Sequence, residues 1–238
     1  MFTKRLVLLS VFVLTCGSTF AAPNWVFDQA TFDGVVGAFP RSDVDFDSVA
    51  PGPIADGGMV DGLMFTYVSG LEPNELNVVA DSSLATTGSN YLGSDVNGLL
   101  GDDLSFSISS TEAFFALSFQ VVAPDFGLFA DDIRITVNGL TTNFAPDFAP
   151  ADGVPDNEVQ VGNNFRYFFG VTDPAGFDSV TISTPQILGA SEFFGIDSIQ
   201  FVSASAVPEP GSLALLTTLG VNGAWRLGRR KSKKPATP

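Results

Sequence analysis

Short stretches of alternating apolar and polar residues recur through the middle of the chain. Residues 105–109 read Ser-Phe-Ser-Ile-Ser and residues 133–137 read Ile-Arg-Ile-Thr-Val, so each stretch has one apolar and one polar face. A period of two is typical of a β-strand with one buried face. No segment keeps the i, i+3, i+4 apolar spacing of an amphipathic helix. The pattern therefore predicts an all-β body.

Gly, Pro, Asp and Asn separate these stretches, as expected of turns between short strands. Asn138-Gly139 predicts a two-residue hairpin turn, because both residues accept a positive φ. Long loops are expected over 34–62 and 143–164. The expected strands are 25–32, 64–67, 76–80, 103–109, 113–121, 132–137, 166–171, 179–184 and 195–202.

The last of these strands lies in residues 194–201, Phe-Gly-Ile-Asp-Ser-Ile-Gln-Phe, which resemble the closing strand of secreted jelly-roll domains. In those domains an acidic residue between two apolar positions lies near a structural calcium ion. The resemblance implies a single β-sandwich of jelly-roll type. Residues 22–206, a length that one sandwich fills, are expected to form it.

Residues 1–21 have the pattern of a secretory signal peptide. A basic pair precedes an apolar run over 6–14, and small residues follow. Thr19 and Ala21 suit the positions three and one before the cut. Ala22 is therefore the expected first residue of the mature chain, and signal peptidase an expected partner.

Residues 207–238 contain Val-Pro-Glu-Pro-Gly, then an apolar run over 211–225 and a basic tail. The run is short for a membrane span, since a helix needs about 20 residues to cross the hydrocarbon core. The Lys and Arg residues that follow it are expected to stay on the cytoplasmic side, which leaves the preceding domain outside. On periodicity alone, a short amphipathic tail with a solvated charge run is the alternative.

This order of features resembles the PEP-CTERM sorting signal of Gram-negative bacteria, whose carriers are handled by a membrane-embedded exosortase. The resemblance covers residues 207–238. It implies that Pro208, Glu209 and Pro210 are the recognition and processing residues, and that 211–225 is a single transmembrane helix that anchors the chain temporarily. It also implies an exosortase-type enzyme as a partner, and a final location at the cell surface or in the extracellular polysaccharide matrix.

The expected mature body is strongly acidic. Between residues 22 and 206 there are three basic residues, all Arg, against 25 acidic residues, a net charge of −22. Phosphate binding needs clustered Lys and Arg, so nucleic acid is excluded as a partner of the body. The charge suits divalent cations, or simply a solvated surface.

The chain has no histidine, and its one cysteine, Cys16, lies in the leader. Ser-His-Asp and Cys-His catalysis and imidazole zinc sites are thereby excluded, and the mature body can form no disulfide. Lipid attachment at Cys16 is the weaker alternative to plain secretion, because Leu14-Thr15 is not the small pair that a lipobox needs. A carboxylate pair of the glycosidase kind is the enzymatic option left, and the sequence singles out no such pair.

Calcium takes six to eight oxygen ligands, and acidic segments supply candidates. Asp33 and Asp197 lie near the two ends of the body, where one ion could tie terminal strands together. Asp152 and Asp156 belong to Asp-Gly-Val-Pro-Asp-Asn-Glu, which resembles part of a thrombospondin type 3 calcium loop; a Gly-Pro turn with surface acids is the alternative. Residues 43–47, Asp-Val-Asp-Phe-Asp, fit an acidic edge strand better than an EF-hand.

These features predict a non-catalytic exported protein with a structural or adhesive role, with calcium as the one expected cofactor. A carbohydrate-binding module for extracellular polysaccharide is the first alternative, and a carboxylate-pair glycan hydrolase is the second. The Trp and Tyr residues of the body offer no obvious sugar platform, because they are scattered over Trp25, Tyr67, Tyr91 and Tyr167.

Overall fold

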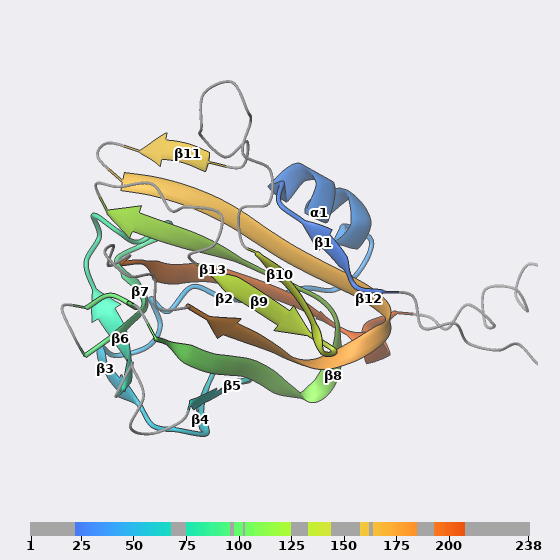
Figure 1. Cartoon of the computed structure of the whole chain (residues 1–238), viewed down its shortest axis with the longest axis horizontal. Coiled ribbons are helices and arrows are strands. Elements are labelled where there is room, and N and C mark those ends of the chain that lie inside the picture. The colour runs from blue at the N-terminus through green and yellow to red at the C-terminus, as the bar shows by residue number, and fades with distance from the viewer. Residues whose placement is uncertain are drawn as a thin grey trace, which may run out of the picture.

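The computed structural model describes residues 22–67, 75–95, 98–101, 103–124, 133–143, 158–161, 164–184 and 193–207. This part of the chain is mostly β, with a large antiparallel sheet (Figure 1). The helices are α1 (Gln29–Val36) and the 3-10 turn η1 (Ala204–Ala206). The strands are β1 (Asn24–Val26), β2 (Ser42–Val44), β3 (Gly52–Ile54), β4 (Gly58–Val60), β5 (Leu63–Tyr67), β6 (Leu76–Ala80), β7 (Asn90–Ser94), β8 (Ser105–Pro124), β9 (Arg134–Val137), β10 (Leu140–Asn143), β11 (Glu158–Val161), β12 (Asn164–Ser183) and β13 (Gly195–Ser203).

Two strands of 20 residues, β8 and β12, form the centre of the sheet. They pair antiparallel from Asn164 opposite Pro124 to Ser183 opposite Ser105. The register shifts on both sides of Phe177, so the ribbon is irregular near its middle. Such bulges bend strands and increase their twist, which lets the two ends of one ribbon belong to different layers.

Each end of the ribbon has its own neighbours. The first layer contains residues 105–110 of β8 and 179–183 of β12, flanked by β5 with β4 and by β9 with β10. The second layer contains residues 114–124 of β8 and 164–172 of β12, flanked by β1 and β11 on one side. On its other side β13 pairs with β8, followed by β2, β7, β6 and β3.

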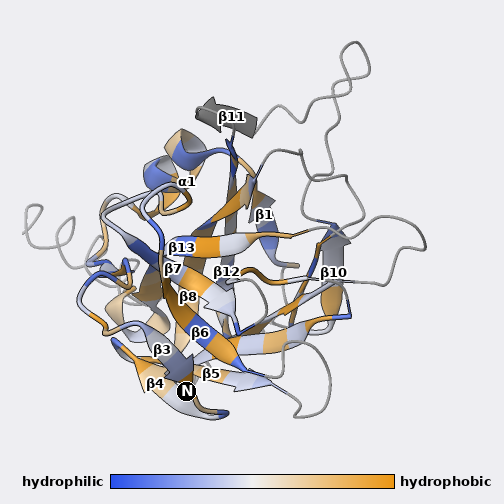
Figure 2. Ribbon diagram, turned by 90° about the vertical axis from the view of Figure 1, so that its left-hand side faces the viewer, coloured by the Kyte–Doolittle hydropathy of each residue, from blue (hydrophilic) through white to orange (hydrophobic). Residues whose placement is uncertain are grey.

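The largest of the buried hydrophobic clusters contains residues from both layers. Phe106, Ile108 and Ile182 of the first layer belong to the same buried cluster as Phe119 and Phe169 of the second. Successive residues of a strand point to opposite faces of the sheet. Residues that alternate with the buried ones, such as Ser107 and Gln120, therefore face outward. Figure 2 shows hydrophobic and hydrophilic residues following one another along β6 and β13. The patterned alternation in the sequence thus becomes two layers that share one dry interior.

Helix α1 covers part of the outer face of the second layer (Figure 1). Asp28 caps its first turn by accepting a hydrogen bond from the Thr31 N–H at 2.7 Å. Phe32 and Val36, four residues apart, are fully buried in a cluster with Phe168 of β12. The strand predicted over 25–32 was therefore wrong beyond β1, because a helix of eight residues is too short to show sustained apolar spacing.

Most of the other predicted strands lie where the structure has strands, but their lengths often differ. The stretches predicted over 103–109 and 113–121 are parts of one strand, β8, and those over 166–171 and 179–184 are parts of β12. Polar and turn residues at the bend concealed this continuity. The Asn138-Gly139 hairpin turn is confirmed, with φ values of 50° and 76° between β9 and β10.

In the described residues, no helix has the length and apolar character needed to cross a membrane. The predicted leader over 1–21 and the predicted sorting signal from Pro208 onward lie outside the described residues.

Candidate functional site

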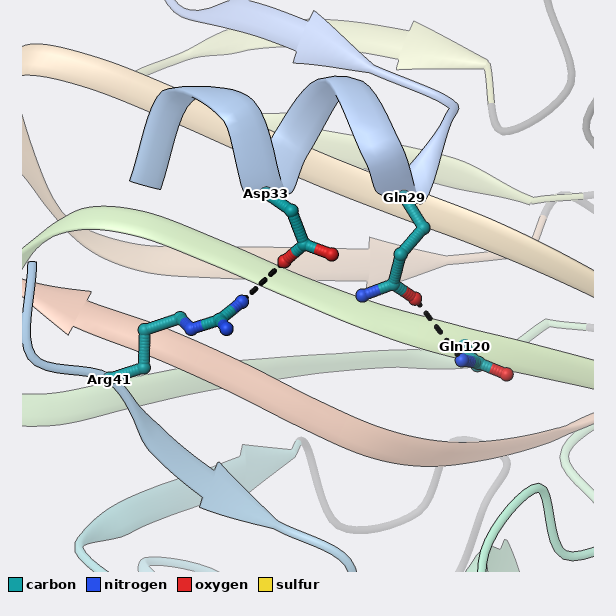
Figure 3. Close-up of polar contacts among 4 residues, drawn as sticks. All are labelled: Gln29, Asp33, Arg41 and Gln120. Atoms are coloured by element: carbon teal, nitrogen blue, oxygen red, sulfur yellow. Dashed lines mark hydrogen bonds and ion pairs between the residues drawn. The ribbon is translucent and has the colours of Figure 1, made fainter. Parts of the chain in front are cut away.

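Asp33 projects from α1 toward the outer face of the second layer. Its carboxylate accepts a charged hydrogen bond from Arg41, which precedes β2 (Figure 3). One turn earlier, Gln29 Oε1 accepts a hydrogen bond from Gln120 Nε2 of β8 at 3.4 Å. Both contacts fasten the helix over the sheet, and the ion pair is partly exposed, so we assign it a positioning role of modest energy.

Asp197 lies on β13 with no exposed surface. Its Oδ2 accepts hydrogen bonds from the Thr86 N–H and hydroxyl, both at 2.7 Å, and from the Thr87 N–H at 3.1 Å. Its Oδ1 accepts from the Ser198 N–H at 2.7 Å. Burial raises the pKa of this carboxyl, and the hydrogen bonds from Thr86, Thr87 and Ser198 oppose the shift. Asp197 thus ties loop 81–89 directly to β13.

The two acids predicted to share a calcium ion therefore have separate protein partners. Strands β12 and β8 also lie between β1 and β13, so the first and last strands are not neighbours. In the ranges that the structure describes, no group of three or more acidic side chains could hold a metal ion. Asp152 and Asp156 lie outside those ranges, and calcium binding there stays a prediction.

The acidic segment over 43–47 binds backbone N–H groups of the protein itself. Asp47 Oδ1 accepts hydrogen bonds from the Ser89 and Asn90 N–H groups, at 2.7 and 3.0 Å. Gly88, whose φ is +57°, passes so close that a Cβ atom there would lie 1.4 Å from Asp47 Oδ2. The segment is therefore a second partner of loop 81–89, next to Thr86 and Thr87, which Asp197 binds.

The two ends of the described domain meet where the β8–β12 ribbon bends; we call this region the terminal pole. Ala22 and Pro23 line a shallow depression of about 390 Å³ together with Gly176 of β12. A Cβ atom on Gly176 would lie 3.6 Å from the Ala204 Cβ of η1. The N-terminal and C-terminal ends of the domain thus lie on the same side, beside the same residue.

Hydrogen bonds fix the C-terminal end at this pole. Glu112 Oε2 accepts from the Ser203 hydroxyl and from the Ser205 hydroxyl, the latter at 2.6 Å. These bonds, led by the Ser203 hydroxyl, lower the pKa of the Glu112 carboxyl. The side chains of Ala206 and Val207 pack against the cluster under α1. The residue before the predicted Pro-Glu-Pro motif is therefore held against the domain.

A row of hydroxyl side chains crosses the outer face of the first layer; we call it the hydroxyl row. Register places its members opposite one another on five adjacent strands, β5, β8, β12, β9 and β10. The Ser107 and Thr181 hydroxyls are 2.8 Å apart, and so are those of Thr136 and Thr141. Neighbouring strands lie about 4.8 Å apart, so the row is a nearly regular line of donors and acceptors. Its members are Thr66, Ser107, Thr181, Thr136 and Thr141.

Sequence reasoning predicted the polar face of residues 105–109 but not the hydroxyl row, because strand order and register were unknown. It also missed Asp173, a carboxylate at the terminal pole that is only 1% exposed. Asn138 Nδ2 donates to Asp173 Oδ2 at 3.0 Å. The one signal in the sequence is the turn-forming run Asp-Pro-Ala-Gly over 173–176, between the strands predicted over 166–171 and 179–184.

No protein family matches the sequence, and no curated protein resembles it. The solved structures that match include two weak likenesses. The K2 cleaved adhesin domain of Lys-gingipain is 16% identical, with a TM-score of 0.42 over 68% of this chain and 99% of that domain. The catalytic unit of the GH87 α-1,3-glucanase of Streptomyces thermodiastaticus is 14% identical, with a TM-score of 0.27 over 69% of this chain and 26% of that protein. Likenesses of this size assign no function.

Proposed function

We propose that this chain is an exported, non-catalytic protein with a structural or adhesive role at the cell surface or in the extracellular matrix. In this proposal residues 22–206 are a β-sandwich of jelly-roll type. Signal peptidase removes residues 1–21, and an exosortase-type enzyme recognises Pro208, Glu209 and Pro210 while residues 211–225 hold the chain briefly in the membrane.

The terminal pole supports this proposal. Ala22, where the mature chain is expected to begin, lies beside Gly176, and so does Ala204, shortly before the predicted motif. A domain attached through one side can present its opposite side to the surroundings. Glu112 and its two serine partners stabilise the attachment point, so that the motif begins directly after a fixed residue, Val207.

The experiment compares location and C-terminal processing of three forms in the producing bacterium. One is the natural chain, the second lacks Val207–Pro238, and the third carries Pro208→Ala, Glu209→Ala and Pro210→Ala. We expect the natural chain at the surface or in the matrix in a shortened form. We expect the triple variant to stay uncut in the membrane fraction, and the truncated form to lose its location.

A matched control changes the anchor without touching the motif, by Thr217→Ala and Thr218→Ala. This variant is expected to be processed like the natural chain. Unchanged location and processing of the truncated form would contradict the proposal, as would a cytosolic chain that keeps its first 21 residues.

The hydroxyl row favours a second candidate function, the binding of extracellular polysaccharide. Five aligned hydroxyls on one sheet face offer both donors and acceptors, which matches the hydrogen-bonding capacity of sugar hydroxyls. The test is a glycan array that compares the natural protein with a Thr66→Val, Ser107→Ala, Thr181→Val variant. Loss of binding in this variant, and not in a Ser42→Ala control at an exposed position on β2, would support it. If the natural protein binds no glycan on the array, polysaccharide binding is contradicted.

A further inference from the structure

Asp173 is a buried carboxylate that forms no ion pair with a cation of the described residues. Its Oδ1 accepts from the Ala175 N–H at 2.8 Å and its Oδ2 accepts from Asn138 Nδ2 at 3.0 Å. A carboxylate has about four acceptor positions, so these two bonds leave capacity for another donor. A buried charge of this kind is costly unless a charge of opposite sign approaches it.

None of the described arginines serves this purpose. Arg41 pairs with Asp33, and Arg166 donates to the Ala85 carbonyl oxygen. Arg134 stands opposite Ser183, at the end of β9 remote from Asn138. The body contains no lysine. The side chains of the described domain therefore provide no cation for Asp173.

The N-terminal end of the domain lies beside this carboxylate. Asn24 of β1 stands opposite Thr172 of β12 in antiparallel register, so Pro23 continues toward Asp173 and Ala22 toward Pro174. Among the described residues that line the depression at the terminal pole, Asp173 is the only one with a titratable side chain. The other lining residues are Ala22, Pro23, Asn138, Leu140, Ala175 and Gly176.

We propose that the α-ammonium group of Ala22, created when the leader is removed, binds the Asp173 carboxylate in this depression. This inference rests on the leader removal that is part of the proposed function. Hydrolysis of the Ala21–Ala22 peptide bond consumes one water, leaves a carboxylate on Ala21 and gives Ala22 a primary amine, which takes up a proton. The cut thus creates the cation that the described side chains do not supply to Asp173. Export would in this way be coupled to formation of the ion pair at the terminal pole.

The test measures the ionisation of the terminal amine in chains that all end at Pro238. One chain begins at Ala22, a second retains Phe20-Ala21, a third begins at an N-acetylated Ala22, and a fourth combines the Ala22 start with Asp173→Asn. The pH dependence of amine acylation, located by peptide mass spectrometry, gives the pKa of the terminus; thermal unfolding gives the melting temperature.

In the Ala22 chain we expect the pKa of the amine to lie well above the usual value of about 8 for a chain terminus. In the extended chain and in the Asp173→Asn chain it should be ordinary. The Ala22 chain should also melt about 2–4 °C higher than the extended and acetylated forms near pH 6, with the difference disappearing above pH 10. The extended and acetylated chains keep Asp173, so they test the ion pair even if the substitution prevents folding.

An ordinary pKa in the Ala22 chain, or equal melting temperatures of the Ala22 and acetylated chains near pH 6, would overturn the inference. A start other than Ala22, found by sequencing the exported protein, would overturn it as well. Because these chains are made without a leader, either in vitro failure would leave the proposed export untouched. Failure of export in cells would in turn leave the measured ion pair intact.

Discussion

The ring of Phe32 lies directly against the backbone of Gly170, so closely that a Cβ atom on Gly170 would lie 2.6 Å from Phe32 Cδ2. Gly170 belongs to β12 and Phe32 to α1, and Phe32 is fully buried. The absence of a side chain on the strand thus sets how closely the helix can approach the sheet. The contact therefore sets how α1 packs on the outer face of the second layer.

Gly170→Ala is expected to lower the free energy of unfolding by about 1–3 kcal/mol, because the ring of Phe32 must shift within a packed cluster. Urea denaturation measures the change. Gly34→Ala is the matched control, since a Cβ atom there meets nothing within 4 Å and alanine favours a helix. Gly34→Ala should raise stability slightly; a similar loss in both variants would contradict the contact as the cause.

Asp197→Ala is expected to lower the free energy of unfolding by about 3 kcal/mol at pH 7. The substitution leaves the N–H groups of Thr86, Thr87 and Ser198 without their acceptor, and each buried orphan costs about 1–3 kcal/mol, reduced where water enters. Amide hydrogen exchange of Thr86 and Thr87 should accelerate more than that of strand β12. Asp43→Ala, an exposed acid on β2, should change stability by no more than about 0.5 kcal/mol.

Glu112 is expected to contribute to acid unfolding. Hydrogen bonds from the Ser203 and Ser205 hydroxyls lower the pKa of its carboxyl in the folded state. Its stabilising effect is therefore present above the unfolded value of 4.5 and is lost as the pH falls through the lower folded value. Glu112→Gln should flatten the rise of stability between pH 3 and pH 5, measured by urea denaturation. Glu75→Gln, an exposed control, should keep the natural slope.

Calcium is expected to raise the melting temperature if Asp152 and Asp156 form a site, because a ligand that binds only the folded state stabilises it by mass action. The combined Asp152→Asn and Asp156→Asn variant should lose this response, measured with excess calcium and with chelator. Asp33→Asn should keep it, since Arg41 is the partner of Asp33. A melting temperature of the natural protein that chelator leaves unchanged would contradict the predicted calcium site.

The strands could be predicted from sequence where alternation was strict. Phe106, Ile108, Ile135 and Val137 are buried as their pattern indicated, and the Asn138-Gly139 turn joins two strands. Helix α1 could not be predicted in this way, because only Phe32 and Val36 mark its buried side. The continuity of β8 and β12 through their bends depends on pairing between residues far apart in the chain, which local pattern does not contain.

The candidate sites were less accessible to sequence reasoning for the same reason. Asp197 was singled out by its place between apolar residues, but loop 81–89, more than 100 residues earlier, supplies its partners. Asp173 was not singled out, because its burial arises from the turn at Asn138 and the strand end at Pro23. Acidic residues can be recognised in a sequence, whereas the groups that donate hydrogen bonds to them are known only from the fold.

The position of β13 has a consequence for the order of assembly. This strand closes the gap between β8 and β7, yet it is the last strand in the described part of the chain and ends at Ser203. In the export that we propose, β8 would keep an open edge until almost all of residues 22–206 had crossed the membrane, and open edges invite pairing with other chains. A tail that detains the chain at the membrane would hold each molecule apart from its neighbours during that interval, and so protect it from aggregation until the sheet is closed.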